Sequence, residues 1–406
     1  MKILVVCQHY YPEQFRITDI CEELVKRGHQ VTVLTGLPNY PMGYIYPGYK
    51  DKSKRREIIN GVDVRRTFTI GRRSGIAFRV LNYYSFMLSS CKYVGKLDDD
   101  YDVVLVNQLS PVMMAEAGVK YKKKHGARLV IYTLDLWPDS LTVGGIKKGS
   151  IPYKYYHRVS KKIYKSADKI LVTSKEFKEY FHNEFGIDDC EYLPQYAETI
   201  FDPESCKKNP DGNIDLMFAG NVGIAQSVDT IIRAAALTKD IENLRFHIVG
   251  DGSELEKCKQ LALSLDANNV IFHGRKPLEE MPKYYAMADA MLVTLYKNDV
   301  ISKTLPGKMQ TYMAAGKAII GSIDGEAATV IREAQCGICA PAENAESLAE
   351  CARELVNNKT LIRYYSENAL AYYAKTFDSN TILELIEDHL HENIDDKLGL
   401  RNPQYR

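Results

Sequence analysis

Short apolar runs alternate with helical patterns in the first half of the chain. Residues 2–6 are almost all apolar and mostly β-branched, and residues 17–25 then place apolar side chains three to four positions apart. The first pattern is typical of a strand buried on both faces, and the second of an amphipathic helix. Gly28 ends this predicted helix. Further strands are predicted at residues 31–34, 103–106, 129–132 and 170–172, with a helix that ends at Lys124.

A polar segment separates this series from a second one. Residues 197–212 contain Pro203, Pro210 and Gly212, which are typical of a linker. The next strands are predicted at residues 216–219, 245–249, 270–273, 291–295 and 318–321, with helices at 228–236 and 255–265. Strands separated by helices imply parallel sheets covered on both faces.

We therefore expect an α/β protein with two Rossmann-like, doubly wound domains that face each other across a cleft. The first domain is predicted to span residues 1–200 and the second residues 201–379. A last helical pattern, at residues 382–391, lies within the segment 380–406. This segment is expected to pack back on the first domain.

The composition is that of a globular protein. The chain has 406 residues, of which 45% are hydrophobic and 26% charged, and a net charge of +1, which excludes a disordered or fibrous chain. No apolar stretch reaches the ~20 residues that a bilayer span needs, so secretion and transmembrane anchoring are not expected. Nine cysteines without regular spacing predict reduced thiols in the cytoplasm.

Positive charge is concentrated in the first half of the chain. Residues 1–200 have a balance of +9, and the remaining residues one of −8. Residues 76–94 have apolar side chains at helical spacing, which fits either a helix buried in the core or an amphipathic helix on a membrane surface. Basic clusters favour the membrane, because each basic residue near an anionic leaflet contributes ~1 kcal/mol, although each cluster is alternatively a solvated face. They lie at residues 52–56, 120–124 and 147–165.

Four glycine-containing turns in the second half follow predicted strands or begin a predicted helix. They are residues 220–223 (GNVG), 249–252 (VGDG), 272–276 (FHGRK) and 305–309 (LPGKM). The carboxyl ends of parallel strands meet at one edge of a sheet, so we expect these turns on the same rim. Glycine lets the backbone approach a ligand, and the amides that open a helix attract anions. A diphosphate is therefore the expected ligand, and the alternative is a set of tight turns that bind nothing.

Four longer segments occur in an order that resembles one enzyme family. They are GHQVTVLTGLPNYPMG at residues 28–43, LDLWPDS at 134–140, AGNVGIAQ at 219–226 and LPGKMQTYMAAGKAII at 305–320. Together they resemble the retaining GT-B glycosyltransferases of the fourth family. The sequence of these segments is most similar to the WbuB-like bacterial branch, whose enzymes extend the repeat units of O-antigen or capsule.

The resemblance implies a UDP-sugar bound mainly by the second domain and an acceptor bound by the first. The implied donor-binding residues are Gly220, Asn221, Val222, Gly223, Gln226, Gly250, Gly274, Arg275, Lys276, Leu295, Lys297, Lys303, Thr304, Leu305, Pro306, Gly307, Lys308, Thr311 and Glu326. The implied acceptor-binding residues are Phe15, Arg16, Asn39, Tyr40, Asn107, Gln108 and Trp137. Trp137 is alternatively part of the core.

The chain departs from the family pattern at four of these positions. The paired glutamates of the family fall on Lys303 and Thr311, and the arginine and lysine of its glycine loop fall on Asn221 and Gln226. Sugar and ribose recognition must therefore differ from the family pattern. We expect Lys303 or Lys308 to supply the missing positive charge, and Glu326 to take a hydroxyl-binding role.

Glycosyl transfer needs a stabilised leaving diphosphate and an oriented acceptor hydroxyl. Fixed positive groups contribute most to such catalysis, which makes Arg275 and Lys308 candidate catalytic residues. Asp135 follows a predicted strand and is the third candidate, as a base or as an orienting group; the alternative is a turn or a helix cap. His9 either contacts a ligand or is a satisfied loop histidine. No metal and no cofactor other than the UDP-sugar co-substrate is expected.

The predicted function is metal-independent, retaining transfer of a hexosyl group, in particular an N-acetylated amino or deoxyamino sugar. The expected partners are a UDP-sugar, an undecaprenyl-diphosphate-linked saccharide and an anionic membrane surface, without nucleic acid. The expected location is the cytoplasm, at the inner face of the plasma membrane. Two alternatives remain: a sugar-nucleotide-binding subunit without activity, and a sugar-nucleotide epimerase of similar fold.

Overall fold

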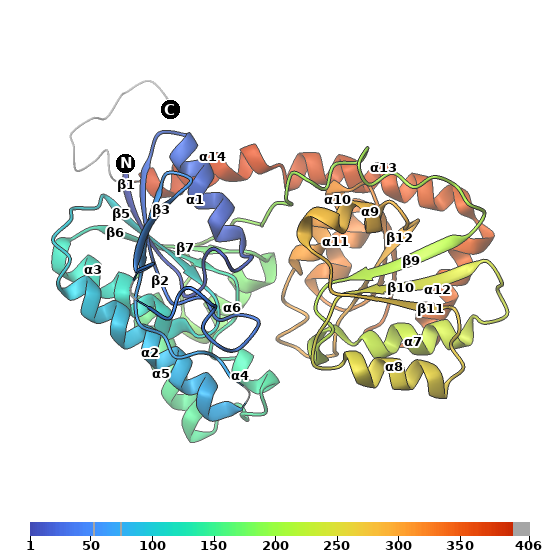
Figure 1. Cartoon of the computed structure of the whole chain (residues 1–406), viewed down its shortest axis with the longest axis horizontal. Coiled ribbons are helices and arrows are strands. Elements are labelled where there is room, and N and C mark those ends of the chain that lie inside the picture. Colours follow the sequence, from blue (N-terminus) through green and yellow to red (C-terminus); the bar gives the residue numbers. More distant parts are fainter. Residues whose placement is uncertain (52, 74, 393–406) are drawn as a thin grey trace. The chain divides into compact units, whose positions relative to one another are not determined.

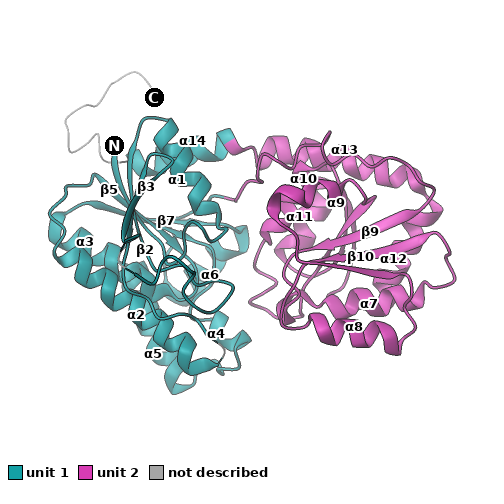
Figure 2. Cartoon of the chain, in the orientation of Figure 1, with its two compact units in different colours: residues 1–193, 380–406 teal, residues 194–379 magenta. Residues whose placement is uncertain are grey.

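The computed structural model describes residues 1–51, 53–73 and 75–392 (Figure 1). They form two compact units (Figure 2). Unit 1 comprises residues 1–193 together with the chain from Asn380 onward, and unit 2 comprises residues 194–379. The segment that was predicted as a linker instead packs on unit 2, since Phe201 and Cys206 are buried in its core.

Unit 1 is built on an eight-stranded sheet with the order β3-β4-β2-β1-β5-β6-β7-β8. Its strands are β1 (Lys2–Val6), β2 (Gln30–Thr35), β3 (Arg56–Ile59), β4 (Val62–Arg66), β5 (Val103–Gln108), β6 (Arg128–Thr133), β7 (Lys169–Val172) and β8 (Cys190–Tyr192). All neighbours pair in parallel except β3 and β4. The chain adds β2 on one side of β1 and β5 on the other, so the strand order reverses between β1 and β5. Ligands of open α/β sheets bind at the carboxyl ends of the strands at such a point.

The helices of unit 1 bury apolar side chains, except for the short helix Ser140–Val143, which has no buried residue. They are α1 (Arg16–Lys26), α2 (Ile76–Gly95), η1 (Val112–Ala115), α3 (Glu116–His125), α4 (Ser140–Val143), α5 (Ile151–Tyr164), α6 (Lys175–Phe185) and α14 (Ser379–His391). From α14, Glu387 accepts hydrogen bonds from Arg27 and His29, both at 2.7 Å. Glu392 pairs with Arg128 at 2.8 Å. The end of the described chain is thus part of unit 1, beside residues from its beginning.

Helix α2 is buried over part of its length, as one of the two alternatives predicted. Tyr83, Phe86 and Val94 are buried in unit 1. The first turns are uncovered instead, and Ile76 and Leu81 are 76% and 48% exposed. None of the described helices has both the length and the apolar character that crossing a bilayer requires.

Unit 2 contains a six-stranded parallel sheet with the order β11-β10-β9-β12-β13-β14. Its strands are β9 (Ile214–Ala219), β10 (Leu244–Val249), β11 (Val270–Gly274), β12 (Ala290–Thr294), β13 (Ala318–Ser322) and β14 (Gly337–Ala340). Its helices are η2 (Ile224–Gln226), α7 (Val228–Leu237), α8 (Leu255–Ser264), η3 (Leu278–Glu280), α9 (Met281–Tyr285), α10 (Gly307–Ala314), α11 (Glu326–Ala334), α12 (Ala345–Asn357) and α13 (Lys359–Thr376). The strand order reverses between β9 and β12. Alternate residues of β9 face opposite cores, Phe218 on one side and Met217 on the other, which confirms a sheet covered on both faces.

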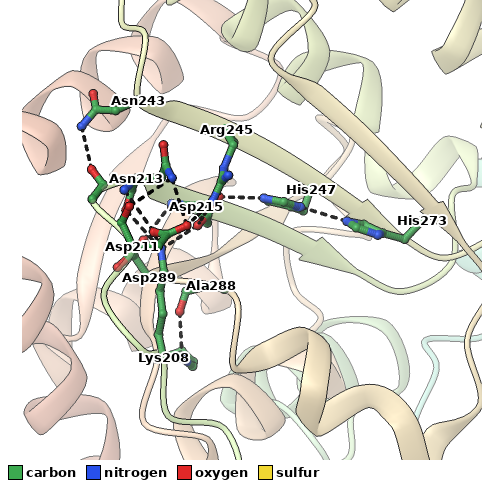
Figure 3. A network of polar contacts seen from close by, with 12 residues as sticks. Lys208, Asp211, Asn213, Asp215, Asn243, Arg245, His247, His273, Ala288 and Asp289 are labelled. Atoms are coloured by element: carbon green, nitrogen blue, oxygen red, sulfur yellow. Dashed lines mark hydrogen bonds and ion pairs between the residues drawn. The ribbon is translucent and has the colours of Figure 1, made fainter.

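A network of charged side chains lies at the amino ends of the unit 2 strands (Figure 3). At its centre is Asp215, which is 1% exposed. It accepts hydrogen bonds from Lys208 at 2.6 Å, from Arg245 at 2.6 and 2.8 Å and from His247 at 2.8 Å. His247 contacts His273 in turn, with 2.9 Å between ring nitrogens. Lys208, in the segment that was predicted as a linker, is thus bonded to Asp215 of β9, which also pairs with Arg245 of β10.

Candidate functional site

The loop after β9 is held to its neighbours by backbone hydrogen bonds at the carboxyl edge of the unit 2 sheet. Val222 donates to the carbonyl of Asp251 at 2.9 Å, in the loop after β10. Ala225 accepts from the amide of Tyr296 at 2.9 Å, in the loop after β12. The carbonyl of Gln226 accepts from the Thr294 hydroxyl at 2.5 Å. The structure therefore brings together three loops that flank the reversal of strand order.

Two of the glycines allow the loops to approach this closely. Gly250 has a φ of 149°, and a Cβ atom there would lie 1.8 Å from the carbonyl oxygen of Gly220. A Cβ atom on Gly252 would lie 2.3 Å from the carbonyl oxygen of Val222. The glycine turns predicted from the sequence are thus needed for contact between loops.

Gly250→Ala is expected to destabilise unit 2 by at least ~2 kcal/mol, because both the φ angle and the carbonyl of Gly220 must change. Thermal melting measures this loss. Gly274→Ala is the matched control: Gly274 has a φ of 68°, but nothing lies within 4 Å of its added Cβ. The control costs ~1–2 kcal/mol for the left-handed backbone alone, so equal melting temperatures for the two variants contradict the close approach.

The side-chain nitrogen of Lys308 is buried and has no hydrogen-bond or ion-pair partner among the residues that the structure describes. Lys308 is the second residue of α10, directly after Gly307. Its Nζ atom is enclosed, has no hydrogen bond to any described residue, and lies 3.8 Å from the centroid of the Phe218 ring. A Cβ atom on Gly220 would lie only 3.0 Å from this nitrogen, so the ammonium group is at the glycine loop. Burial lowers the pKa of Lys308 to about 7.

The amino end of α10 adds positive potential at the same place. Its first amides have no intrahelical acceptor, and they attract anions together with the helix dipole. Pro306 precedes the helix with an extended backbone and leaves the following amides unobstructed. The side-chain nitrogen of Lys308 and the start of α10 therefore both favour an anion beside Gly220.

Other residues of the predicted donor set are buried in the core, lie over another ring or are exposed. Thr311 is 7% exposed and donates to the carbonyl of Gly307 at 3.4 Å, and Leu305 is in the core. Lys276 lies over the Tyr284 ring, 5.3 Å from its centroid. Arg275 is exposed at the end of β11.

The remaining donor candidates are at the ends of their elements. Glu326 is 3% exposed at the start of α11, where its amide donates to the carbonyl of Ser302 at 3.0 Å. Lys297 is exposed after β12, and its amide donates to Glu343 at 3.0 Å. Asn221 donates to the side chain of Gln226 at 3.3 Å, so the two residues that depart from the family pattern are bonded to each other. Lys303 and Thr304 precede α10 and are partly buried.

At the carboxyl end of β1 in unit 1, His9 and Glu13 form a buried pair. Nδ1 of His9 lies 3.1 Å from each carboxylate oxygen of Glu13. The same carboxylate accepts the backbone amides of Asn39 at 2.8 Å and Tyr40 at 2.6 Å. Phe15 stacks on the imidazole with 5.1 Å between ring centroids. Glu13 was missed by the sequence analysis, because its partners come from the loop after β2.

Several predicted acceptor residues serve the framework of unit 1. Asn39 is buried, donates to Leu37 and accepts from Arg72 and Asn82. Gln108 is buried as well, and its side-chain oxygen accepts from Tyr164 at 3.0 Å. Trp137 is 4% exposed and meets Tyr156 edge to face. The side chains of two further members, Phe15 and Tyr40, lie near His9. Arg16 is the first residue of α1, and Asn107 is the second to last residue of β5.

Asp135 follows β6 at the same edge of the sheet. One carboxylate oxygen accepts the amide of Ser110 at 3.1 Å. Burial raises the pKa of Asp135, although the hydrogen bond from Ser110 and the charge of Arg72 oppose the rise. A carboxyl group with this tendency is suited to exchange a proton or to hold a hydroxyl.

The two units match two families of glycosyltransferase domains. Residues 14–194 match the family described as Glycosyltransferase Family 4, and residues 202–372 match Glycosyl transferases group 1. The chain is a glycosyltransferase with a group 1 domain in unit 2. Its two parallel sheets with covering helices are the GT-B fold, as predicted.

This glycosyltransferase is similar over most of its length to bacterial proteins. It is 24% identical over 402 residues to WcaI of Escherichia coli K12, named for colanic acid biosynthesis, a match that covers 91% of this chain and 96% of WcaI. It is 28% identical over 267 residues to the glycosyltransferase WbjE of Pseudomonas aeruginosa, a match that covers 63% of this chain and 66% of WbjE.

Solved structures share its fold. HepE of Anabaena, in complex with UDP and glucose, has a TM-score of 0.70 at 16% identity, covering 97% of this glycosyltransferase and all of HepE. WaaG, a glycosyltransferase of lipopolysaccharide biosynthesis, has a TM-score of 0.69 at 16% identity, with 97% of this chain and 100% of WaaG covered.

Proposed function

We propose that this glycosyltransferase transfers a sugar from a UDP-sugar to a lipid-linked saccharide in the synthesis of a bacterial surface polysaccharide. Unit 2 binds the donor and unit 1 the acceptor. The sugar is an N-acetylated amino or deoxyamino hexose, the configuration at its anomeric carbon is retained, and the acceptor is carried on undecaprenyl diphosphate. Membership of the WbuB-like branch stays a prediction.

The observation that carries this proposal is the unpaired ammonium group of Lys308. A buried charge without a counter-charge is costly, and functional sites are where such groups are retained. A ligand group that pairs with Lys308 has negative charge and lies close to both Gly220 and the start of α10. The diphosphate of a sugar nucleotide meets both requirements.

The same groups suit the departure of UDP. Charge develops on the diphosphate as the bond to the sugar breaks, and fixed positive groups then stabilise the transition state more than the ground state. Lys308, Arg275 and the amides of Gly223 and Gly307 supply this charge. The leaving phosphate takes the proton of the attacking hydroxyl, and Asp135 orients the acceptor.

Two relatives support the choice of substrates. HepE was solved with UDP and glucose, which supports a UDP-sugar donor. WcaI is named for the biosynthesis of colanic acid, which supports a polysaccharide product.

A transfer assay tests the proposal. The protein is incubated with UDP-glucose, UDP-galactose, UDP-N-acetylglucosamine and UDP-N-acetylgalactosamine, each with an undecaprenyl-diphosphate-linked saccharide. Release of UDP together with an acceptor enlarged by one sugar is expected. Binding of UDP without transfer or donor hydrolysis supports the inactive subunit, and an epimerised UDP-sugar formed without acceptor supports the epimerase.

We also propose that unit 1 rests on the anionic inner face of the plasma membrane, with the enzyme otherwise in the cytoplasm. Ile76, Leu81 and Ile151 are exposed at the starts of α2 and α5, and Ile151 is 85% exposed. These helices are neighbours, since the hydroxyls of Tyr84 and Tyr156 lie 3.3 Å apart. Exposed basic residues accompany the apolar ones: Arg73, Arg79, Lys147, Lys148, Lys154 and Arg158. Apolar side chains beside basic ones are the pattern of a helix at an anionic lipid surface.

Binding to vesicles checks this part of the proposal. The protein is expected to sediment with phosphatidylglycerol-containing vesicles at low salt, and the double variant Ile76→Ser, Leu81→Ser to bind at least about tenfold more weakly, since two apolar anchors are lost. Leu263→Ser is the control, because Leu263 is 78% exposed but belongs to unit 2. Equal sedimentation with phosphatidylcholine vesicles, or binding that salt does not weaken, contradicts the anionic surface.

A further inference from the structure

The hydrogen bonds around Glu13 fix the orientation of the His9 imidazole. The Glu13 carboxylate accepts two backbone amides besides the contact to Nδ1 of His9. A carboxylate oxygen accepts hydrogen bonds, so the tautomer with its hydrogen on Nδ1 is the one that fits this contact. The second nitrogen, Nε2, then has a free lone pair, as when a carboxylate orients the histidine of a catalytic site.

The Nε2 atom is open in the protein. No described residue is hydrogen-bonded to Nε2, and this atom is not fully enclosed. His9 as a whole is only 5% exposed. The imidazole is thus held through Nδ1 and keeps one ring nitrogen to which no described residue is hydrogen-bonded. Glu13 does not need His9 to anchor the loop, since the amides of Asn39 and Tyr40 already do so.

The position of His9 in the sheet points to a ligand. His9 follows β1, and the strand order reverses between β1 and β5. This is the place where open α/β sheets bind their ligands. Asn107 is a buried polar residue, second to last in the neighbouring strand β5. The Phe15 and Tyr40 rings lie 5.1 and 5.7 Å from the imidazole, and Tyr40 is 39% exposed. An acceptor of hydrogen bonds beside an exposed aromatic ring suits a sugar, which has hydroxyls at its edge and C–H groups on its faces.

We propose that Nε2 of His9 accepts a hydrogen bond from a hydroxyl group of the acceptor saccharide. His9 is then an acceptor-binding residue of unit 1, and Glu13 is a positioning residue that sets its tautomer and angle. This inference rests on the proposed function and adds to it the group that recognises the acceptor. A site built to bind a hydroxyl rejects an analogue that lacks it.

Two substitutions separate this role from a structural one. His9→Asn keeps an N–H group near the position of Nδ1, and so the bond to Glu13, but removes the acceptor at Nε2. His9→Gln keeps an oxygen near the position of Nε2 and gives up the bond to Glu13. Transfer is measured with the UDP-sugar and the undecaprenyl-diphosphate-linked saccharide that the wild type uses, UDP binding by calorimetry, and folding by thermal melting.

His9→Asn is expected to lower kcat/KM for the acceptor about 10- to 100-fold, with unchanged UDP affinity and melting temperature, and His9→Gln to lower it less. Acceptors that lack single hydroxyls provide a second readout. One of these deoxy acceptors is expected to have a low kcat/KM with the wild type and the same low kcat/KM with His9→Asn. The two losses do not add, because the residue and the hydroxyl take part in the same contact.

Three results overturn the inference. They are a larger loss in His9→Gln than in His9→Asn, wild-type kcat/KM in both variants, and additive losses for His9→Asn with every deoxy acceptor. A wild type that binds UDP but transfers no sugar overturns the proposed function itself and the inference with it. Failure of the inference alone leaves wild-type transfer intact, so the two failures are distinguishable.

Discussion

Replacing Lys308 by methionine is expected to weaken UDP binding roughly 30- to 1000-fold and at the same time to stabilise the ligand-free protein. The loss corresponds to about 2–4 kcal/mol for one partner of a buried ion pair. The gain arises because methionine has a similar length, packs well on the Phe218 ring and carries no charge to be buried. Replacing a buried charge by an apolar side chain commonly adds about 1–4 kcal/mol.

The pH dependence of this gain has a definite sign. Burial lowers the pKa of Lys308 to about 7 in the folded protein, whereas an unfolded chain keeps the ordinary value near 10.4. Between these values the unfolded state binds the extra proton, so the wild type loses stability as pH falls from about 10.4 to 7. The variant lacks this loss. Its advantage in denaturant unfolding is therefore expected to be largest at pH 6 and to shrink as pH rises toward 10.

Calorimetry and a second lysine complete this test. UDP is expected to bind the wild type with uptake of a proton near pH 8, seen as a binding heat that depends on the ionisation enthalpy of the buffer. Lys317→Met is the control, because burial lowers the pKa of Lys317 to about 8 but its Nζ atom donates to the carbonyl of Ala288 at 2.8 Å. The control is expected to lose stability and to keep UDP affinity. Wild-type affinity in Lys308→Met contradicts an anion site at the start of α10.

Asp215→Ala is expected to destabilise unit 2 by about 3–5 kcal/mol. Asp215 is the common acceptor for Lys208, Arg245 and His247 (Figure 3). Removal of one member of a buried charge network leaves the others with less compensation, although Lys208 keeps its contact to Asp289 and Arg245 its contact to Asp211. Denaturant unfolding at pH 7 measures the loss. Asp211→Asn is the control: Asp211 is exposed and also pairs with Arg245, so its loss is expected to be small.

Acid is expected to reduce the difference between Asp215→Ala and the wild type. Burial opposes ionisation of Asp215, but the hydrogen bonds from His247, Arg245 and Lys208 outweigh it and hold the pKa well below the usual range. Such a carboxylate contributes its full stability above the unfolded pKa near 3.9, and the contribution falls as pH decreases toward the folded value. A difference that stays constant between pH 7 and pH 3 contradicts the network as its source.

Strands buried on both faces were predicted from the sequence more accurately than the strands at the edge of the sheet. The apolar runs at β1, β5, β9 and β12 were found within one or two residues, because strands buried on both faces leave an unbroken apolar signal. The β3–β4 hairpin was missed, since its exposed edge alternates polar and apolar residues. Asn60 and Gly61 between these strands both have positive φ and were an available signal for a hairpin turn.

The chemistry of the site was predictable only in part. Glycines before helices indicated the loops around Gly220 and Gly250, because the backbone requirement is local. Whether a charged side chain has a partner depends on contacts distant in sequence. Nothing near Lys308 in the chain indicates an enclosed amine, and the partners of Glu13 at residues 39 and 40 approach it only because β1 and β2 pair.

The return of the chain to unit 1 through α14 gives the two units different histories during synthesis. Unit 2 is one uninterrupted stretch, residues 194–379, and all of it is available before α14 leaves the ribosome. The synthesis of unit 1 begins first and ends last, because Glu387, the hydrogen-bond partner of Arg27 and His29, is synthesised only after unit 2. A stop codon near residue 379 therefore spares every residue of unit 2 and leaves unit 1 incomplete, whereas expression of residues 194–379 alone keeps the six-stranded sheet of unit 2 whole.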